Sequence, residues 1–290
     1  MGFFDAIKSI FGDRVDVAKR FETIKKANYG TMSKFLIVRD RKNDNRICGL
    51  KIIDMEKLKQ VEARWVGQNK PSEGEISSRF NHPYIAKTFE YGMTTQNENY
   101  ILFEYLEGLG MNTMILNHPN QLDGRRLMFL RQGAEAIQTV HDAGFIHRDI
   151  CPRNFLLNSD GSVMKLTDFG LSVPASGVFL QPGNRTGTPN YMAPELVRRR
   201  PTDQRLDIFA YGMTMYEIMT GDLPWPRGAT GQAAMSHDTP PVPLLELKPN
   251  ADPVLAAAIM SCIESNPNKR CPTMKHFLQQ IKYVRAENVL

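Results

Sequence analysis

Cysteine is scarce in this chain, and its four cysteines follow no regular spacing. Cys48, Cys151, Cys262 and Cys271 form none of the closely spaced pairs that metal-binding motifs use, and nothing in the sequence indicates secretion. A disulfide framework and a structural zinc site are therefore poor explanations for the fold. We expect four reduced thiols in a cytoplasmic protein.

Long apolar runs are also missing. The longest, Val254 to Met260, is far too short to span a bilayer. Residues 1–12 lack the basic start and the small-residue cleavage site of a signal peptide. Ala6 occupies the position at which N-myristoylation requires serine or threonine. We therefore expect neither a transmembrane segment nor a myristoyl anchor.

Charge of one sign is not concentrated in any region. The net charge is +5, but the basic residues are scattered, and Arg198 to Arg200 is the densest run. A solvated helix end accounts for that run, so we expect no nucleic-acid partner. The composition, 42% hydrophobic and 23% charged, is typical of a folded globular chain. The 290 residues suffice for two lobes, each with its own core.

The apolar pattern changes once along the chain, from strand-like to helical. Strand-like runs occur at residues 21–29, 33–39, 47–53, 86–91 and 99–104. Beyond Gly108 the periodicity is mostly helical. We predict an α+β, bilobal fold, whose parts are a β-rich N-terminal lobe (20–105), a hinge (104–108), an α-helical C-terminal lobe (109–285) and a tail (286–290).

Two helices are predicted within the β-rich lobe. The first covers residues 56–66, and Pro71 interrupts the chain after it. Ser72-Glu73-Gly74-Glu75 then has the pattern of a capping box, in which the first and last residues satisfy each other's backbone N–H groups. The second helix is therefore expected to begin at this tetrapeptide.

Residues 1–19 precede the lobes as an amphipathic extension. Large apolar residues of the first turns share one helical face: Phe3, Phe4, Ile7, Ile10 and Phe11. We favour a short helix packed on the protein, and a helix over residues 1–12 that docks on a membrane surface or a partner is the alternative.

The octapeptide His147-Arg148-Asp149-Ile150-Cys151-Pro152-Arg153-Asn154 carries the clearest chemical signal. It follows an apolar-periodic helix (130–143) and precedes a short strand (155–157), so it is expected to form a loop. Asp149 and Asn154 are five positions apart. A carboxylate there can accept a proton from an attacking hydroxyl while an amide oxygen holds a metal ion, which suits phosphoryl transfer.

Further motifs follow in order: Asp168-Phe169-Gly170, Gly187 to Glu195, Asp207 to Gly212 on an apolar helix, and Arg270. Each is weak alone, whereas the whole series at workable spacing is specific. Over roughly residues 20–285 the chain resembles the eukaryotic-type protein kinase superfamily, and most of all the serine/threonine protein kinases. The resemblance implies an ATP- and Mg²⁺-dependent enzyme that phosphorylates serine and threonine in protein substrates.

The resemblance also implies roles for matching residues. Lys51 would pair with the α- and β-phosphates, Asp149 would be the catalytic base, and Asn154 and Asp168 would bind Mg²⁺. Thr188 would hydrogen-bond Asp149. The expected nucleotide contacts are Ala27 and Gly30 of the phosphate-covering loop, Met32, Gly49 and Leu156 around the base, and Phe103, Glu104 and Leu106 at the hinge.

Three scaffold residues also match the family. Glu195 and Arg270 correspond to a structural ion pair, and Asp207 to a residue that braces the backbone of the catalytic loop. For the carboxylate that pairs with Lys51 we favour Glu73, with Glu75 as the alternative.

The chain departs from the family pattern in two places. Only Gly30 remains of three glycines expected in the phosphate-covering loop. Cys151 replaces the lysine typical of serine/threonine kinases, and Arg153 sits where tyrosine kinases often carry arginine, so Arg153 is expected to substitute for that lysine in catalysis. The alternatives are tyrosine or dual specificity, and a pseudokinase that binds nucleotide as a scaffold with little turnover.

Arg148 suggests regulation by phosphorylation of the segment between Asp168 and Gly187, because an arginine beside the catalytic base can pair with a phosphate. The available acceptors are Ser172, Ser176 and Thr186, and constitutive activity is the alternative.

Overall fold

The computed structural model describes residues 14–26, 33–183, 185–228 and 237–286. The chain divides into two compact units: unit 1 comprises Met1–Asn81 and Ala86–Leu106, and unit 2 comprises His82–Ile85 and Glu107–Leu290. Unit 1 is β-rich and unit 2 is mainly helical, which confirms the predicted α+β class. Within the described ranges, no helix has both the length and the apolar character that a membrane crossing requires. The helix predicted over residues 1–12 lies outside these ranges.

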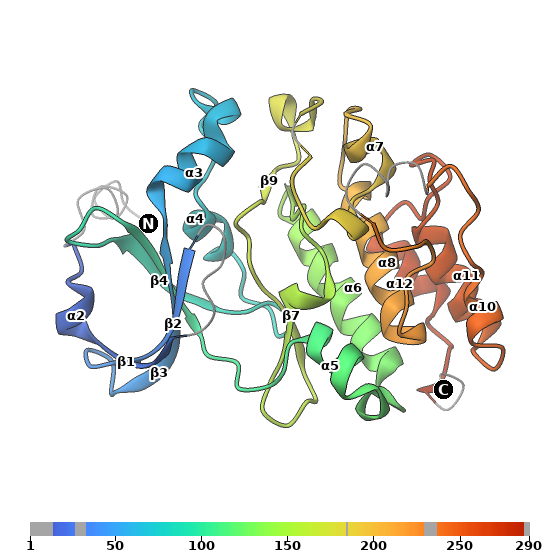
Figure 1. Cartoon of the computed structure of the whole chain (residues 1–290), viewed down its shortest axis with the longest axis horizontal. Coiled ribbons are helices and arrows are strands. Elements are labelled where there is room, and N and C mark those ends of the chain that lie inside the picture. Colours follow the sequence, from blue (N-terminus) through green and yellow to red (C-terminus); the bar gives the residue numbers. More distant parts are fainter. Residues whose placement is uncertain (1–13, 27–32, 184, 229–236, 287–290) are drawn as a thin grey trace. The chain divides into compact units, whose positions relative to one another are not determined.

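Unit 1 is built on a five-stranded antiparallel sheet with the strand order β1-β2-β3-β5-β4 (Figure 1). The strands are β1 (Phe21–Lys26), β2 (Ser33–Asp40), β3 (Arg46–Ile53), β4 (Thr88–Met93) and β5 (Asn99–Glu104). β4 begins two residues later than predicted, because the backbone N–H of Lys87 donates to the side chain of Glu104 instead of joining the ladder. Alternate residues of β3 and β5 form the core on one face: Cys48, Leu50, Ile52, Tyr100 and Leu102.

Four short helices complete the described part of unit 1: α2 (Val17–Arg20), α3 (Met55–Glu62), a 3₁₀ turn (Ala63–Trp65) and α4 (Glu73–Ser77). The helix predicted over 56–66 is α-helical only to Glu62; the 3₁₀ turn continues it to Trp65, and Val66, with ψ of 127°, leaves the helical conformation. The predicted capping box at Ser72 is confirmed.

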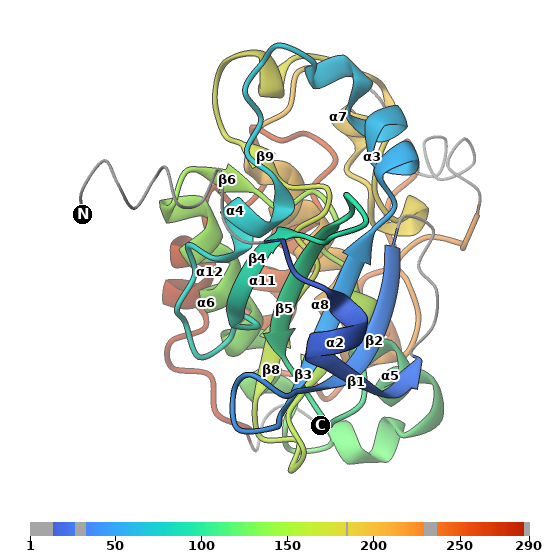
Figure 2. The ribbon, with the colours of Figure 1, turned by 90° about the vertical axis from the view of Figure 1, so that its left-hand side faces the viewer.

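Helix α4 lies beside β4, as Figure 2 shows. A Cβ atom at Gly74 would come within 2.6 Å of Tyr91 Cβ, so only glycine permits this close approach.

Unit 2 is organised around one buried helix. Its helices are α5 (Met111–Asn117), α6 (Arg126–Asp142), α7 (Pro194–Val197), α8 (Arg205–Thr220), α10 (Leu244–Leu247), α11 (Pro253–Cys262) and α12 (Met274–Gln280). Every residue of α8 from Leu206 to Met219 is buried, and α6 and α11 pack against it (Figure 1). A Cβ atom at Gly212 would lie 2.7 Å from Cys262 Cβ, so this glycine sets the distance between α8 and α11.

Two small antiparallel pairs of strands frame the predicted catalytic loop. β6 (Phe145–Ile146) pairs with β9 (Val173–Pro174), and β7 (Phe155–Leu157) pairs with β8 (Met164–Leu166). β7 has the bounds predicted for the short strand at residues 155–157. The other pair was missed, because a strand of two residues is too short to show an alternating pattern.

Candidate active site

Asp207 on α8 holds the first residues of the loop from His147 to Asn154 in place. The Asp207 carboxylate accepts hydrogen bonds from the backbone N–H groups of His147 (2.7 Å) and Arg148 (2.8 Å), and its Oδ2 lies 3.0 Å from His141 Nε2. The predicted bracing of the loop by Asp207 is thus confirmed. Burial would raise the pKa of Asp207, but the contacts with His141 and His147 outweigh it and hold the pKa below its usual value. The carboxylate is therefore ionised where the loop needs an acceptor.

Arg148 has an unusual backbone conformation. Its φ of +69° lies in the left-handed region, which is unfavourable for a residue with a side chain. The hydrogen bond from its N–H to Asp207 offsets that strain. The Arg148 side chain donates to Thr186 Oγ1 at 3.3 Å, so one of the three predicted phosphate acceptors lies beside it. Ser172, another of the three, is fully buried and donates to the His147 carbonyl.

Asp149 lies at the centre of a hydrogen-bond network. Its Oδ1 accepts from the backbone N–H (2.9 Å) and the hydroxyl (2.7 Å) of Thr188. Its Oδ2 accepts from Asn154 Nδ2 (3.0 Å) and from Arg153 Nη2 (3.1 Å). The predicted bond from Thr188 is present, and four donors fix the orientation of the carboxylate.

Cys151 is buried next to this network. Its sulfur lies 3.4 Å from the Thr188 hydroxyl oxygen. Burial, together with the charge of Asp149, raises the pKa of the Cys151 thiol to about 11, so the side chain is neutral at physiological pH. It cannot supply the positive charge of the lysine that it replaces. Arg153, whose side chain is 59% exposed, is the cation in contact with Asp149.

Asn154 and Asp168, the predicted metal ligands, lie close together in unit 2. The Thr167 N–H and hydroxyl both donate to the Asn154 carbonyl (2.9 and 3.1 Å), which brings Asp168 alongside the end of the loop. Asp168 has a φ of +62°, and its carboxylate accepts from the Gly170 N–H at 3.3 Å. The peptide backbone therefore turns sharply where the carboxylate is presented.

The donor atoms fit a hard divalent cation. Asn154 Nδ2 donates to Asp149 twice, to its carbonyl (2.7 Å) and to its carboxylate, which leaves the amide oxygen of Asn154 for coordination. The described residues contain no group of three or more His, Cys, Asp or Glu side chains that could hold a metal. A pair of oxygen ligands is the usual protein contribution to Mg²⁺, because substrate phosphates and water supply the rest.

In unit 1, Lys51 forms an ion pair with Glu73. The ammonium donates to both carboxylate oxygens, at 2.7 and 2.9 Å, and the two side chains are only 13% and 8% exposed. Of the two glutamates considered, the structure therefore pairs Glu73. Glu75 is engaged in the capping box, where its carboxylate accepts from the Ser72 N–H.

Gly49, predicted to contact adenine, shares the second face of the sheet with Lys51. In register, Gly49 lies opposite Phe103, and Lys51 lies opposite Ile101 on one side and Phe35 on the other. The Phe35 ring also covers Gly49, since a Cβ atom there would be 2.7 Å from Phe35 Cζ. Sequence reasoning missed Phe35, because its contact with Gly49 is diagonal across two strands.

The remaining predicted nucleotide contacts are distributed between the units. Phe103 is buried and precedes Glu104, the last residue of β5, whose N–H donates to the Lys87 carbonyl; Leu106 is the last residue of unit 1. Leu156, on β7 of unit 2, is half-buried beside Gly110. Their nucleotide contacts stay predictions. Ala27, Gly30 and Met32 lie outside the described residues.

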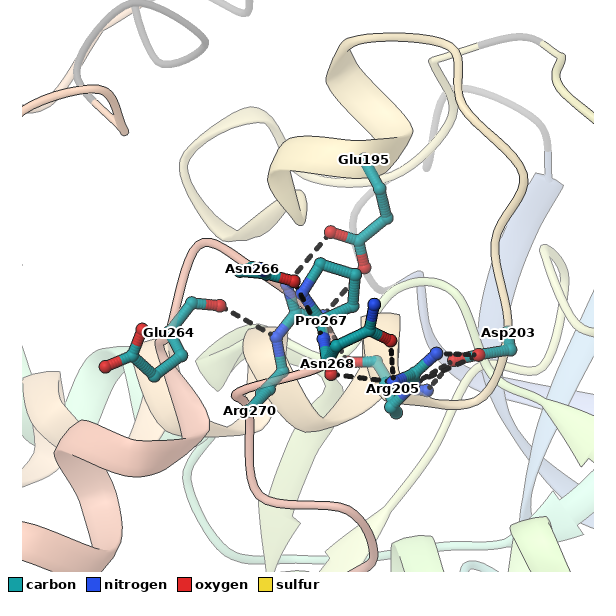
Figure 3. Close-up of polar contacts among 8 residues, drawn as sticks. All are labelled: Glu195, Asp203, Arg205, Glu264, Asn266, Pro267, Asn268 and Arg270. Atoms are coloured by element: carbon teal, nitrogen blue, oxygen red, sulfur yellow. Dashed lines mark hydrogen bonds and ion pairs between the residues drawn. The ribbon is translucent and has the colours of Figure 1, made fainter.

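A buried ion pair joins Glu195 of α7 to Arg270, much later in the chain (Figure 3). Arg270 donates to both Glu195 oxygens, at 2.7 and 2.9 Å, and also to the carbonyls of Glu264 and Arg205. The ion pair predicted between Glu195 and Arg270 is therefore confirmed. Arg205 extends the cluster with a bidentate contact to Asp203, which the sequence did not predict.

A second cluster, also missed, lies next to Thr188. The Tyr191 hydroxyl donates a hydrogen bond to Glu217 Oε2, and Arg227 Nη2 donates to Glu217 Oε1 at 2.7 Å. Burial first, and then the charge of Glu217, raises the pKa of Tyr191, so the phenol is a neutral donor. The contacts join Glu217 of α8 to residues outside the helix, 26 positions before and 10 positions after it, and no helical or strand periodicity predicts them.

Comparison with known proteins supports the motifs. Residues 21–283 match the family model described as "Protein kinase domain". The chain is 28% identical over 226 residues to "Serine/threonine-protein kinase pkn3" of Myxococcus xanthus, covering 74% of this chain and 41% of that protein. It is 32% identical over 208 residues to human "Ribosomal protein S6 kinase alpha-2", covering 71% of this chain and 28% of that protein. The chain thus spans less than half of the length of these relatives.

Proposed function

This chain belongs to the protein kinase family, and from that premise we propose that it transfers the γ-phosphoryl group of ATP to serine and threonine hydroxyls of protein substrates. The kinase domain would extend over residues 20–285. The observation that carries the proposal is the network at Asp149, in which an ionisable carboxylate is oriented by four hydrogen-bond donors.

The proposed reaction uses Asp149 as the base. The substrate hydroxyl oxygen attacks the γ-phosphorus in line, its proton passes to Asp149, and the bond from phosphorus to the ADP oxygen breaks. Thr188 and Asn154 hold the carboxylate, and the Oδ2 lone pair that Arg153 occupies would accept the proton once Arg153 turns to the transferred phosphate. ADP and the phosphorylated protein are the products.

Positive charge is required wherever negative charge develops on the transferred group. When bound, Mg²⁺ would neutralise phosphate charge, and Asn154 and Asp168 are the residues that would hold it. Lys51, oriented by Glu73, would bind the phosphates of ATP. Arg153 would replace the missing lysine at the transferred phosphate, since its guanidinium already lies 3.1 Å from Asp149 Oδ2.

The assignment of Arg153 leads to a paired prediction. Cys151→Lys should change turnover little, because Arg153 already supplies the charge, whereas Arg153→Ala should lower kcat by about 10²-fold. A large gain in turnover from Cys151→Lys would instead mean that the site lacks a necessary cation.

Serine/threonine specificity is favoured over tyrosine specificity by Thr188. Its hydroxyl bridges Asp149 and Cys151, at 2.7 and 3.4 Å, in a Gly-Thr-Pro segment of the serine/threonine type. Mapping of the phosphorylated residues in substrate proteins tests this choice, and a majority of phosphotyrosine would overturn it.

The activity is tested with the purified chain, labelled ATP, MgCl₂ and a mixture of acidic and basic proteins, beside Asp149→Ala. Incorporation should fall by about 10³-fold in the variant, because a general base contributes on the order of 10²–10⁴. Equal incorporation by both forms would refute catalysis by Asp149.

A parallel thermal-shift measurement with ATP, with and without Mg²⁺, examines the pseudokinase alternative. Ligand at a hundredfold excess over Kd stabilises a protein by about 2.7 kcal/mol. ATP-dependent stabilisation without turnover would favour a nucleotide-binding scaffold.

A further inference from the structure

Arg227 is a half-exposed cation that is held in place by the cluster next to Thr188. Its Nη2 donates to Glu217 at 2.7 Å, and 46% of its side chain is exposed. The N–H of the next residue, Gly228, donates to Asn190 Oδ1 at 3.0 Å. Gly228 therefore contacts the 3₁₀ turn Pro189–Tyr191 directly, and Arg227 is linked to the same turn through Glu217, which also accepts from Tyr191.

The position of that turn places Arg227 near the acceptor site. Thr188, which precedes the turn, is bonded to Asp149. A 3₁₀ helix rises about 2 Å per residue, so Tyr191 lies about 6 Å along the chain from Thr188. An extended substrate chain spans about 3.3–3.6 Å per residue, and a residue a few positions from the acceptor can therefore reach Arg227.

The buried Glu217 carboxylate that contacts Arg227 already has hydrogen-bond donors on both oxygens. Tyr191 and Arg227 occupy the two oxygens of Glu217, whose side chain is 6% exposed. A basic substrate residue could reach Glu217 only by displacing Arg227. Asp222 is exposed but lies 3.9 Å from Arg227 Nε, a distance too long for a hydrogen bond, so the guanidinium still presents donors to solvent.

We propose that Arg227 is a specificity-determining residue that binds a carboxylate side chain of the protein substrate, within a few residues of the phosphorylated serine or threonine. This inference rests on the proposed kinase function and adds the substrate class. A guanidinium fits a carboxylate in a bidentate arrangement, and Glu217 holds it in position from behind. Arg153, the exposed guanidinium at Asp149, reinforces the positive charge that an acidic substrate segment meets.

The test uses the full chain with ATP and Mg²⁺ and a set of peptides that share a central serine. Each of the four positions on either side is changed in turn to Glu, Ala or Arg, and kcat/KM is measured for every peptide. At one or more positions we expect Glu to exceed Ala by about fivefold, through KM, as for a partly exposed ion pair. Arg at the same position should be the poorest.

Variants then assign the preference to Arg227. Arg227→Gln should remove the preference for Glu, and it should improve peptides with Arg because Glu217 becomes accessible; Arg227→Lys should keep part of the preference. Arg125→Gln is the matched control, because this exposed arginine precedes α6, whose 17 residues span about 25 Å between it and the end that leads to the catalytic loop.

The outcomes separate the two proposals. No phosphorylation of any peptide or protein above the Asp149→Ala background would refute the kinase function, and this inference with it. Clear phosphorylation with equal kcat/KM for Glu and Ala peptides, or a preference that Arg227→Gln leaves intact, would overturn the role of Arg227 only. The ratio is measured on one preparation, so partial unfolding of a variant does not affect it.

Discussion

In unit 2, Asp207 on the buried helix α8 accepts hydrogen bonds from the backbone just before Asp149, whereas in unit 1 Lys51 is oriented by Glu73 on a helix of five residues. α8 is surrounded by other elements along its whole length, so its position depends on the fold of the entire unit. α4 depends on a capping box at Ser72 and on close contact of Gly74 with Tyr91.

The difference indicates how the predicted site residues of each unit would be disturbed. A helix in the interior opens only when its unit unfolds, whereas a short capped helix can open locally at a lower cost. Disturbing unit 2 should therefore lower stability and activity together. Disturbing α4 should lower activity while the rest of the protein stays folded.

The largest effect is expected where the unit 2 scaffold is broken. Arg270→Ala leaves the Glu195 carboxylate buried without its ion pair, which should lower the free energy of unfolding by about 3–5 kcal/mol. Urea denaturation measures the loss. Arg198→Ala, which removes a surface pair with the 73%-exposed Asp238, should cost less than about 1 kcal/mol. Equal losses of unfolding free energy in the two variants would contradict a larger contribution from the buried ion pair.

Next in size is the separation of activity from stability in unit 1. Lys51→Met should lower kcat/KM by about 100-fold, because the charge that we propose binds the phosphates is lost. Hydrogen exchange in unit 2 should be unchanged. Lys59→Met is the matched control, since Lys59 forms an exposed pair with Glu56 at 3.0 Å. Faster hydrogen exchange throughout unit 2 in the Lys51→Met variant would show that the effect is not confined to unit 1.

Acid should weaken unit 2 through His237, which packs against the Phe209 ring of α8. Burial, and then the charges of Arg198 and Arg270, lower the pKa of His237 to about 4. The unfolded histidine binds a proton below about pH 6.5, and the folded one only near pH 4, so stability falls as pH falls through this window.

The expected loss is about 2 kcal/mol between pH 6.5 and 4. His237→Phe should reduce the slope in urea titrations at several pH values, and His276→Gln, at an exposed position, should not. An unchanged slope in the His237 variant would exclude this histidine as the cause.

The smallest effect is expected at the cap of α4. Ser72→Ala removes the hydroxyl that accepts from the Glu75 N–H and should destabilise this helix by about 1 kcal/mol. Because Glu73 is the first residue of α4, kcat/KM should fall by about fivefold while the urea midpoint barely moves. Ser78→Ala is the matched control, because it removes a serine hydroxyl at the other end of α4. Equal kcat/KM in the two variants would argue against an effect of the Ser72 cap on activity.

Local patterns predicted much of the fold and some of the site. The capping box gave both the start of α4 and the choice between two glutamates, because Glu75 is used by the cap and Glu73 is not. The alternation of β3 put Lys51 and Gly49 on one face. The motif series predicted Asp207 beneath the loop and the pair of Glu195 with Arg270.

Contacts between distant segments could not be predicted in the same way. The contact of Phe35 with Gly49 depends on strand register and ring orientation, neither of which is encoded locally. Arg227 reaches Glu217 from a segment after α8 that has no periodic pattern. The burial of Cys151 follows from the return of Thr188 over the loop, 37 residues later.

The bonds from Asp207 go to backbone N–H groups, which every residue except proline possesses. The start of the loop is therefore held by two bonds that do not depend on the side chains of His147 and Arg148. A cysteine at position 151 and an arginine at position 153 leave both of these bonds in place. The anchoring of the loop by Asp207 is thus compatible with a departure from the family pattern such as Cys151.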